Sequence, residues 1–185
     1  GKSTTTKLVE YALKENKKNS FSAGNIGIPI SKLKLKQHIL TYLIVEASSF
    51  QLERIIELKF NISVLLNISN DHIDRHKNIG NYIAAKSNIF KNQSGNDFSI
   101  ICIDDSKTKK LAQNFSKNFN SKLITISSKN SNNCDFFIEL KNDMFVITDK
   151  KKNTIFRFNK NYCILKGKHN LPNILACFVI CELLQ

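Results

Sequence analysis

The feature that most constrains the fold of this chain is an alternation of two hydrophobic patterns along it. Continuous apolar runs, as in residues 39–46 and 62–68, alternate with segments whose apolar side chains recur every three or four residues, as in residues 2–16 and 78–92. Continuous runs of this length are typical of strands buried in a parallel sheet, and the second pattern is typical of amphipathic helices. The alternation therefore predicts an α/β fold with a doubly wound, mostly parallel sheet.

The rest of the chain continues this alternation and then changes. Three further elements are expected in the order strand, helix, strand, at residues 99–103, 107–117 and 123–126. A short helix fits residues 51–58, and a final helix fits residues 171–184, with Pro172 in its first turn. Short strands joined by polar turns predict a small antiparallel β subdomain over residues 134–160. We expect residues 1–185 to form one domain that contains this subdomain.

The positive charge of the chain raises the question of an anionic partner. Lys and Arg number 28 against 15 Asp and Glu, which gives a net charge of +13. The lysines are scattered, and no alternation of basic and aromatic residues indicates a surface on which bases could stack. We therefore expect no nucleic-acid partner. A non-catalytic nucleic-acid-binding module remains the alternative, and its affinity would depend steeply on salt.

Apolar runs and cysteines indicate the cellular compartment of the protein. The longest apolar runs are too short to cross a bilayer or, in residues 174–184, are interrupted by Glu182. No signal-peptide pattern opens the chain, so we expect a cytoplasmic protein without a membrane partner. We expect the 5 cysteines to act as small buried hydrophobes in a reducing compartment, with a metal or redox site as the alternative.

The first helix opens on a sequence typical of the end of a phosphate-binding loop, Gly1-Lys2-Ser3-Thr4. In such a loop, backbone N–H groups at a helix N-terminus hold phosphate oxygens, the lysine reaches the β- and γ-phosphates, and the serine hydroxyl coordinates Mg²⁺. The front of the motif is absent from the sequence. The alternative is therefore an ordinary helix start.

Polar side chains follow two of the predicted strands. Glu46 and Ser48 come at the end of one strand, and His72 follows the next. Ligands of an open α/β sheet bind beyond the carboxyl ends of its strands, so Glu46 and His72 could share a metal ion with Ser3. The alternatives are a helix-capping acid and a surface-loop histidine. His72 and His76 could also suggest zinc, but no further ligand has zinc-site spacing.

Lys86 lies on the apolar face of a predicted helix. Ile79, Tyr82, Ile83 and Phe90 fall at helical spacing, and Lys86 completes the same face. A lysine on an inward face must be paired, must extend its ammonium to the surface, or must be chemically changed. In the last case a neutral amine would react with carbon dioxide, and the resulting carbamate would suit a hard cation.

Two asparagines stand at the start of the final helix. Asn170 could cap this helix, which is the ordinary role of asparagine at such a position. Asn170 and Asn173 both lie in or beside the first turn, and a side-chain amide matches the donor and acceptor edge of adenine. Both interpretations stay open at this point.

Taken together, these segments resemble the Mur ligases, the ATP-dependent amino-acid ligases of bacterial cell-wall synthesis. The matching segments are residues 1–6, 24–29, 46–53, 71–76 and 82–86, with Asn67, Gly167, His169, Asn170 and Asn173. Residues 46–53 are the most specific, because sister ligases for other amino acids carry different residues after the glutamate. The resemblance implies a central, ATP-binding domain with a P-loop-type nucleotide site.

The resemblance also implies a role for each matching residue. The ATP-binding residues would be Gly1, Lys2, Ser3, Thr4, Asn170 and Asn173, with both asparagines at adenine. The metal ligands, for Mg²⁺ or in practice Mn²⁺, would be Ser3, Glu46, His72 and Lys86 as its carbamate. The catalytic residues would be Lys2, Lys86 and His72, and the residues that contact the muramoyl substrate would be Asn25 and Ser48.

The implied reaction joins two substrates. The carboxylate of UDP-N-acetylmuramoyl-L-alanine would be activated by ATP as an acyl phosphate and joined to D-glutamate. A sister ligase for another amino acid or a folate-type substrate is the alternative within the family. We expect a monomer. Because the chain begins without Met and stops inside a helix, we also expect a piece of a longer protein that does not ligate by itself.

Overall fold

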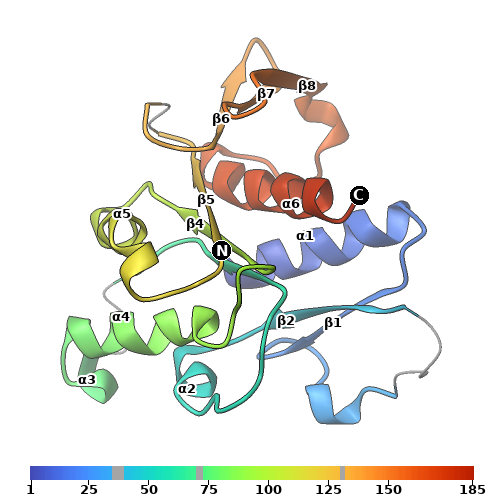
Figure 1. Cartoon of the computed structure of the whole chain (residues 1–185). Helices are drawn as coiled ribbons and strands as arrows, with labels where there is room; N and C mark the ends of the chain where they lie inside the picture. The colour runs from blue at the N-terminus through green and yellow to red at the C-terminus, as the bar shows by residue number, and fades with distance from the viewer. Residues whose placement is uncertain (35–39, 70–72, 130–131) are drawn as a thin grey trace.

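The computed structural model describes residues 1–34, 40–69, 73–129 and 132–185 and shows the α/β fold that the sequence predicts (Figure 1). Its main sheet has six strands in the order β3-β4-β5-β6-β7-β8. Their bounds are β3 Ile62–Leu65, β4 Phe98–Cys102, β5 Lys122–Ser127, β6 Phe136–Lys141, β7 Met144–Asp149 and β8 Thr154–Asn159. Strands β3 to β6 run parallel, which confirms the mostly parallel sheet.

The antiparallel strands near the C-terminus are part of this same sheet. β6 pairs in parallel with β5, where Phe136 lies opposite Ile126, and β7 and β8 then follow antiparallel. The turn between β6 and β7 places Asn142 and Asp143 at φ angles of 45° and 60°, the left-handed conformations that tight hairpin turns require. The predicted antiparallel strands are therefore present, and they extend the main sheet.

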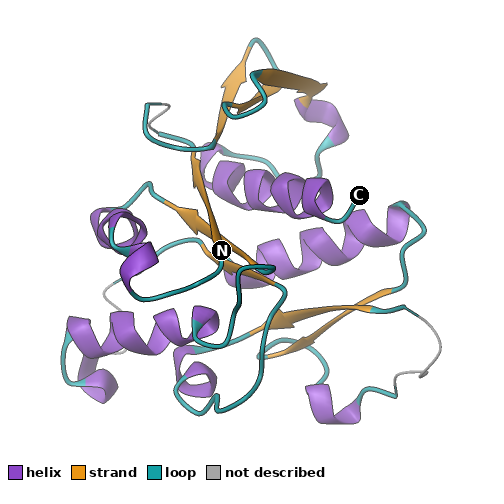
Figure 2. Ribbon diagram, viewed as in Figure 1, coloured by secondary structure: helices purple, strands orange, loops and turns teal. Residues whose placement is uncertain are grey.

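Two further strands form a separate parallel pair. β1 (Ser20–Gly24) pairs with β2 (Tyr42–Glu46), and the pair lies beside the first helix, α1 (Figure 2). The sequence does not predict β1, because the serines and the glycine of this segment have low strand propensity. The sequence also predicts β2 as a buried strand, yet its residues 42–45 are only half-buried. β2 has β1 as its one strand partner among the described residues, which leaves its other edge open.

Helices cover both faces of the main sheet. α1 (Lys2–Glu15) and α6 (Leu171–Leu183) lie side by side on one face, as Figure 1 shows, and α4 (Ile79–Ser87) and α5 (Ser106–Gln113) cover the other. β4 shows the division most clearly, because its successive side chains point to opposite faces. Ile100 packs with α1 and α6, whereas Ile101 packs in the cluster on the opposite face.

The long helices confirm the prediction made from the spacing of apolar residues. The shorter helices have fewer residues than predicted. The expected helix at residues 51–58 is a single turn, α2 (Ser49–Leu52), and a second short helix, α3 (Ile73–His76), precedes α4. The 3-10 helices are Ile30–Lys32, Asn88–Phe90, Phe115–Lys117, Lys160–Tyr162 and Lys168–Asn170. In the described ranges, no helix has the length and apolarity that a membrane crossing requires.

The cysteines are free thiols, as expected. Cys102, Cys134 and Cys177 are buried, and Cys163 and Cys181 are half-buried. Burial raises the pKa of the Cys102 thiol to about 12, with a further contribution from the nearby charge of Asp104. The thiol of Cys102 is therefore protonated at neutral pH, and it packs as an apolar group.

Candidate active site

The N-terminus of α1 is open to solvent. Gly1, Lys2 and Ser3 are exposed, and Gly1, the N-cap residue, has no side chain that could cap the helix. A Cβ built on Gly1 would lie 3.7 Å from Leu66 Cδ1, so the helix starts beside the segment that leaves β3. The first-turn N–H groups of a helix have no partner within the helix and favour an anion. This geometry suits the phosphate role predicted for these residues.

Glu46 stands at the carboxyl end of β2, and one oxygen of its carboxylate has no hydrogen-bond partner among the residues that the structure describes. The residue is only 5% exposed, and its Oε2 accepts no hydrogen bond from the described part of the chain. A buried charged oxygen without a partner destabilises a protein unless a cation neutralises it. Carboxylate oxygen is a preferred ligand of Mg²⁺. Glu46 therefore fits the metal-binding role predicted from the sequence.

The ends of β1 and β2 approach each other closely beside Glu46. The Asn25 N–H donates a hydrogen bond to the Glu46 carbonyl at 2.7 Å. Gly24 has a φ of +109°, and a Cβ at this position would collide with the same carbonyl oxygen. Only glycine tolerates both conditions. The backbone thus holds the exposed Asn25, a predicted substrate contact, next to the predicted metal ligand Glu46.

Ser48 has a structural role that the sequence analysis did not assign. It is the N-cap of α2, where its Oγ accepts a hydrogen bond from Gln51 N at 3.3 Å. The Gln51 side chain in turn accepts one from Ser48 N at 2.9 Å, which completes a capping box. The capping box fixes the turn that leaves β2. Contact of Ser48 with substrate stays a prediction.

Lys86 extends from α4 toward the carboxyl end of β3. Its ammonium donates a hydrogen bond to the Asn67 carbonyl at 3.1 Å and lies 4.7 Å from the ring centroid of Tyr82. The residue is half-buried, so it is paired rather than simply extended into water. Asn67 follows directly on Leu66, beside which α1 begins. The structure thus brings Lys86 and Gly1 to the same segment, whereas His72 lies outside the described residues.

The asparagines of the final helix bind one another. Asn170 is the N-cap of α6 by position, but its side chain forms no cap, so the ordinary interpretation of this residue is wrong. Its amide donates to Lys166 O at 2.8 Å, and its oxygen accepts from Asn173 Nδ2 at 2.8 Å. Thr5 of α1 donates to Asn173 Oδ1 at 3.1 Å. This chain of bonds ties α6 to α1, and adenine contact by the two asparagines stays a prediction.

A residue that sequence reasoning did not place in the site is His76. The sequence suggests it only as an unsupported zinc ligand, but the structure buries it against Ser49 and Phe50, directly after Ser48. No local pattern signals this contact, because the two segments are far apart in the chain. Among the residues described, no cluster of three or more His, Cys, Asp or Glu side chains could hold a metal ion by itself.

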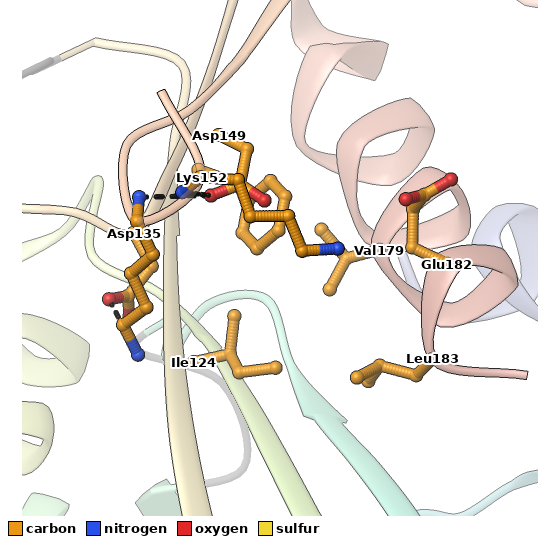
Figure 3. A pocket seen from close by; sticks show the side chains of 9 residues that line it. Ile124, Asp135, Asp149, Lys152, Val179, Glu182 and Leu183 are labelled. Carbon is orange, nitrogen blue, oxygen red and sulfur yellow. Dashed lines mark hydrogen bonds and ion pairs between the residues drawn. The ribbon is translucent and has the colours of Figure 1, made fainter. Parts of the chain in front are cut away.

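A cavity elsewhere in the fold involves none of the predicted site residues. It has a volume of about 170 Å³ and lies between the C-terminal end of α6 and the strands β5 and β6. Figure 3 shows Lys152 reaching over it from the β7–β8 turn toward Val179 of α6. The predicted nucleotide residues of α6 lie at the opposite, N-terminal end of that helix.

Known proteins match the chain over nearly its whole length. Residues 1–181 match the Mur ligase middle domain family. The chain is 38% identical to the UDP-N-acetylmuramoylalanine–D-glutamate ligase of Natranaerobius thermophilus, over 95% of this chain and 37% of that protein. It is also 38% identical to the enzyme of the same name from Clostridioides difficile, over 97% of this chain and 38% of that protein. The chain thus spans well under half the length of these relatives.

Solved structures share the fold at lower sequence identity. A UDP-N-acetylmuramoyl-L-alanyl-D-glutamate–2,6-diaminopimelate ligase superposes with a TM-score of 0.74 at 20% identity, covering 98% of this chain and 41% of that one. The MurF ligase of Thermotoga maritima in complex with ADP gives 0.67 at 18% identity, covering 100% and 43%. The structural similarities show the fold, and the match to the family over residues 1–181 shows the family membership. The chain belongs to the Mur ligase family, as its middle domain.

Proposed function

We propose that this chain is the nucleotide-binding middle domain of a cytoplasmic ligase that joins UDP-N-acetylmuramoyl-L-alanine to D-glutamate and forms ADP. The relatives at 38% identity carry the name of that ligase, and one structural neighbour was solved with ADP. The observation that carries the proposal is the buried Oε2 of Glu46, which accepts no hydrogen bond from any residue in the described ranges. It lies at the end of β2, a strand that packs against α1, and a magnesium–nucleotide complex bound there would supply positive charge.

The residues of this chain would act by positioning and charge neutralisation. Lys2 and the first-turn N–H groups of α1 would hold the β- and γ-phosphates, which reduces the repulsion that opposes attack by the substrate carboxylate on the γ-phosphate. Ser3 and Glu46 would hold Mg²⁺, which supplies further charge neutralisation there. The attack yields an acyl phosphate and ADP.

The second half of the reaction forms the amide bond. The amine of D-glutamate attacks the carbonyl of the acyl phosphate, and the tetrahedral intermediate collapses with loss of phosphate. Asn25 and Ser48 would orient the muramoyl substrate, and Lys86, as its carbamate, would support the metal site near the end of β3. Holding the reacting groups in line would lower the barrier further, because it makes an otherwise bimolecular step effectively unimolecular.

The test is an amino-acid panel on the full-length protein that contains this segment. ADP release is measured with UDP-N-acetylmuramoyl-L-alanine, ATP and Mg²⁺, with each amino acid in turn. We expect release with D-glutamate and not with L-glutamate, glycine, L-lysine or diaminopimelate. A preference for any other amino acid would assign the chain to a sister ligase. Salt-sensitive binding of DNA or RNA without ADP release would support the nucleic-acid-binding module instead.

A further inference from the structure

His76 is a buried ionisable residue to which the mechanism above gives no task. It ends α3, is 3% exposed, and its ring touches polar groups at both nitrogens. Nε2 is hydrogen-bonded to Ser49 Oγ at 3.0 Å, and Nδ1 lies 3.0 Å from Glu53 Oε1. The order serine, histidine, carboxylate resembles a hydrolytic triad. Ser49, however, is only 6% exposed, so its hydroxyl is not placed to attack a substrate.

The faces of the His76 ring are also occupied. Phe50 stacks on one face with ring centroids 5.5 Å apart and planes 15° apart. Tyr82 packs against the ring at 5.1 Å. Cations lie over the outer rings of this stack, Arg75 at 4.1 Å from the Phe50 centroid and Lys86 at 4.7 Å from the Tyr82 centroid. His76 thus contacts two aromatic rings, each of which carries a cation, and we call these three rings with Arg75 and Lys86 the His76 column.

The His76 column joins two predicted parts of the site. At one end, Phe50 and Ser49 follow directly on Ser48, the predicted substrate contact. At the other end, Tyr82 carries the ammonium of Lys86 on its face. Aromatic stacking and cation–π contact are both directional and are strengthened by burial. A shift of the His76 ring would therefore move Ser48 and Lys86 relative to each other.

We propose that His76 is a positioning residue that sets the geometry between the substrate segment at Ser48 and the ammonium of Lys86. This inference rests on the proposed function. The hydrogen bond with Ser49 and the ring contacts with Phe50 and Tyr82 hold the His76 ring in place, and the ring couples its position to both aromatic neighbours. A misplacement of about 1 Å at reacting groups can cost about a hundredfold in rate, so a side chain that touches no substrate can still limit catalysis.

Other contacts hold the surrounding elements in place, so the effect of His76 can be separated from folding. Asn88 of the segment after α4 donates a hydrogen bond to Leu52 O of α2 at 3.2 Å. The nucleotide side of the site is held independently by the bond from Thr5 to Asn173. Removal of the His76 ring should thus leave α2 near α4 and leave α1 bound to α6.

The kinetic test uses the full-length ligase with the substitution His76→Leu. We expect kcat/KM for UDP-N-acetylmuramoyl-L-alanine to fall by about 10–100-fold, the usual range for a residue that orients functional groups, while KM for ATP changes by less than about twofold. A merely structural role would instead lower the unfolding temperature and affect both substrates alike. Unchanged kcat/KM, or an equal rise in both KM values, would overturn the proposal.

A rescue variant and a control sharpen this test. The double substitution His76→Phe with Ser49→Ala restores a ring to the column without leaving a buried hydroxyl unpaired, and we expect it to return kcat/KM to within about fivefold of the wild type. Activity as low as that of His76→Leu would contradict the stacking argument. Phe115→Leu is the matched control, because it removes a buried ring that packs against Phe90 and Phe119, away from the column. It should leave both KM values unchanged.

A structural readout separates this inference from the proposed function. Crystal structures of the full-length wild type and the His76→Leu variant would be compared, whether or not the protein is active with D-glutamate. We expect residues 48–50 to shift and the Lys86 side chain to leave the Tyr82 ring in the variant. If both stay in place, the inference is wrong even where the ligase activity is confirmed. If the wild type releases no ADP with any amino acid, the proposed function fails while the geometric claim is still decided.

Discussion

At the scale of single residues, the half-buried Glu10 and the buried Glu46 differ in where their partners are. Glu10 of α1 has its partners within the chain, because Lys7, Lys14 and Ser22 all bond to its carboxylate. Glu46 has an oxygen without such a partner among the described residues. A carboxylate with partners in the protein, as in Glu10, contributes to stability. A buried carboxylate oxygen without one, as in Glu46, is stabilised when a cation binds it. The same type of side chain thus makes a structural contact at Glu10 and is the predicted metal ligand at Glu46.

The Glu10 network predicts a pH-dependent stability. Burial alone would raise the pKa of Glu10, but hydrogen bonds from Lys14, Ser22 and Lys7 lower it from 4.5 to about 2. A lowered folded-state pKa stabilises the protein above the unfolded value of 4.5, and this contribution is lost as the pH falls toward 2. Glu10→Gln should therefore reduce the free energy of unfolding at pH 7 by roughly 1–3 kcal/mol and by much less near pH 2.5.

Urea unfolding of wild type and variant at both pH values checks this. The matched control is Glu15→Gln on the same helix, whose exposed side chain should give little change at either pH. A Glu10→Gln effect that is the same at pH 7 and pH 2.5 would show that the carboxylate charge is not what stabilises the α1–β1 contact.

Lys86 allows a chemical test of the carbamate prediction. Lys86→Ala removes both the ammonium and any carboxylate formed on it, so we expect ligase activity of the full-length protein to fall by about 10–100-fold. Added formate or acetate should restore part of the activity if the lost group is a carbamate. Lys91→Ala, an exposed lysine shortly after α4, serves as the control. Wild-type activity in Lys86→Ala would remove Lys86 from the site.

At the scale of elements, the pairing of α1 with α6 joins the two predicted halves of the nucleotide site. The bond between Thr5 and Asn173 is buried and spans most of the chain. In a double-mutant cycle, Thr5→Val and Asn173→Ala should be coupled by about 0.5–1.5 kcal/mol in the free energy of unfolding. Thr6→Val, a buried neighbour on α1, should show no coupling to Asn173→Ala. Additive effects of Thr5 and Asn173 would contradict the link.

The elements also show what the sequence reveals and what it conceals. α1 and α6 were predicted to within a residue, because their apolar spacing persists over three or more turns. β1 was missed, because Ser20, Ser22 and Gly24 have low strand propensity and only the pairing with β2 makes them a strand. α2 is shorter than the predicted helix, and residues 42–45 of β2 are less buried than predicted. The pairing of β1, the length of α2 and the burial of β2 all depend on contacts with other segments, which the local sequence does not show.

At the scale of the whole molecule, the predicted site residues follow strands of two sheets rather than one. The sequence indicated that Glu46 follows one strand and that residues 71–76 follow another, and the rule for open α/β sheets predicted one common edge. In the structure β2 pairs with β1 in a sheet of its own, whereas β3 belongs to the main sheet. The connection of β6 to β5, which makes the antiparallel strands part of the main sheet, has no local signal. The His76 column was equally hidden, because ring contacts between distant segments leave no periodic pattern.

The central claim is that the carboxyl edge at Glu46 and the start of α1 hold a metal–nucleotide complex. Anomalous diffraction from crystals of the full-length protein, grown with Mn²⁺ and a non-hydrolysable ATP analogue, tests it most directly. We predict a manganese peak in contact with Glu46 Oε2 and Ser3 Oγ, with the phosphates at the first turn of α1. A manganese–nucleotide complex bound elsewhere, with the Glu46 carboxylate uncoordinated, would contradict the account.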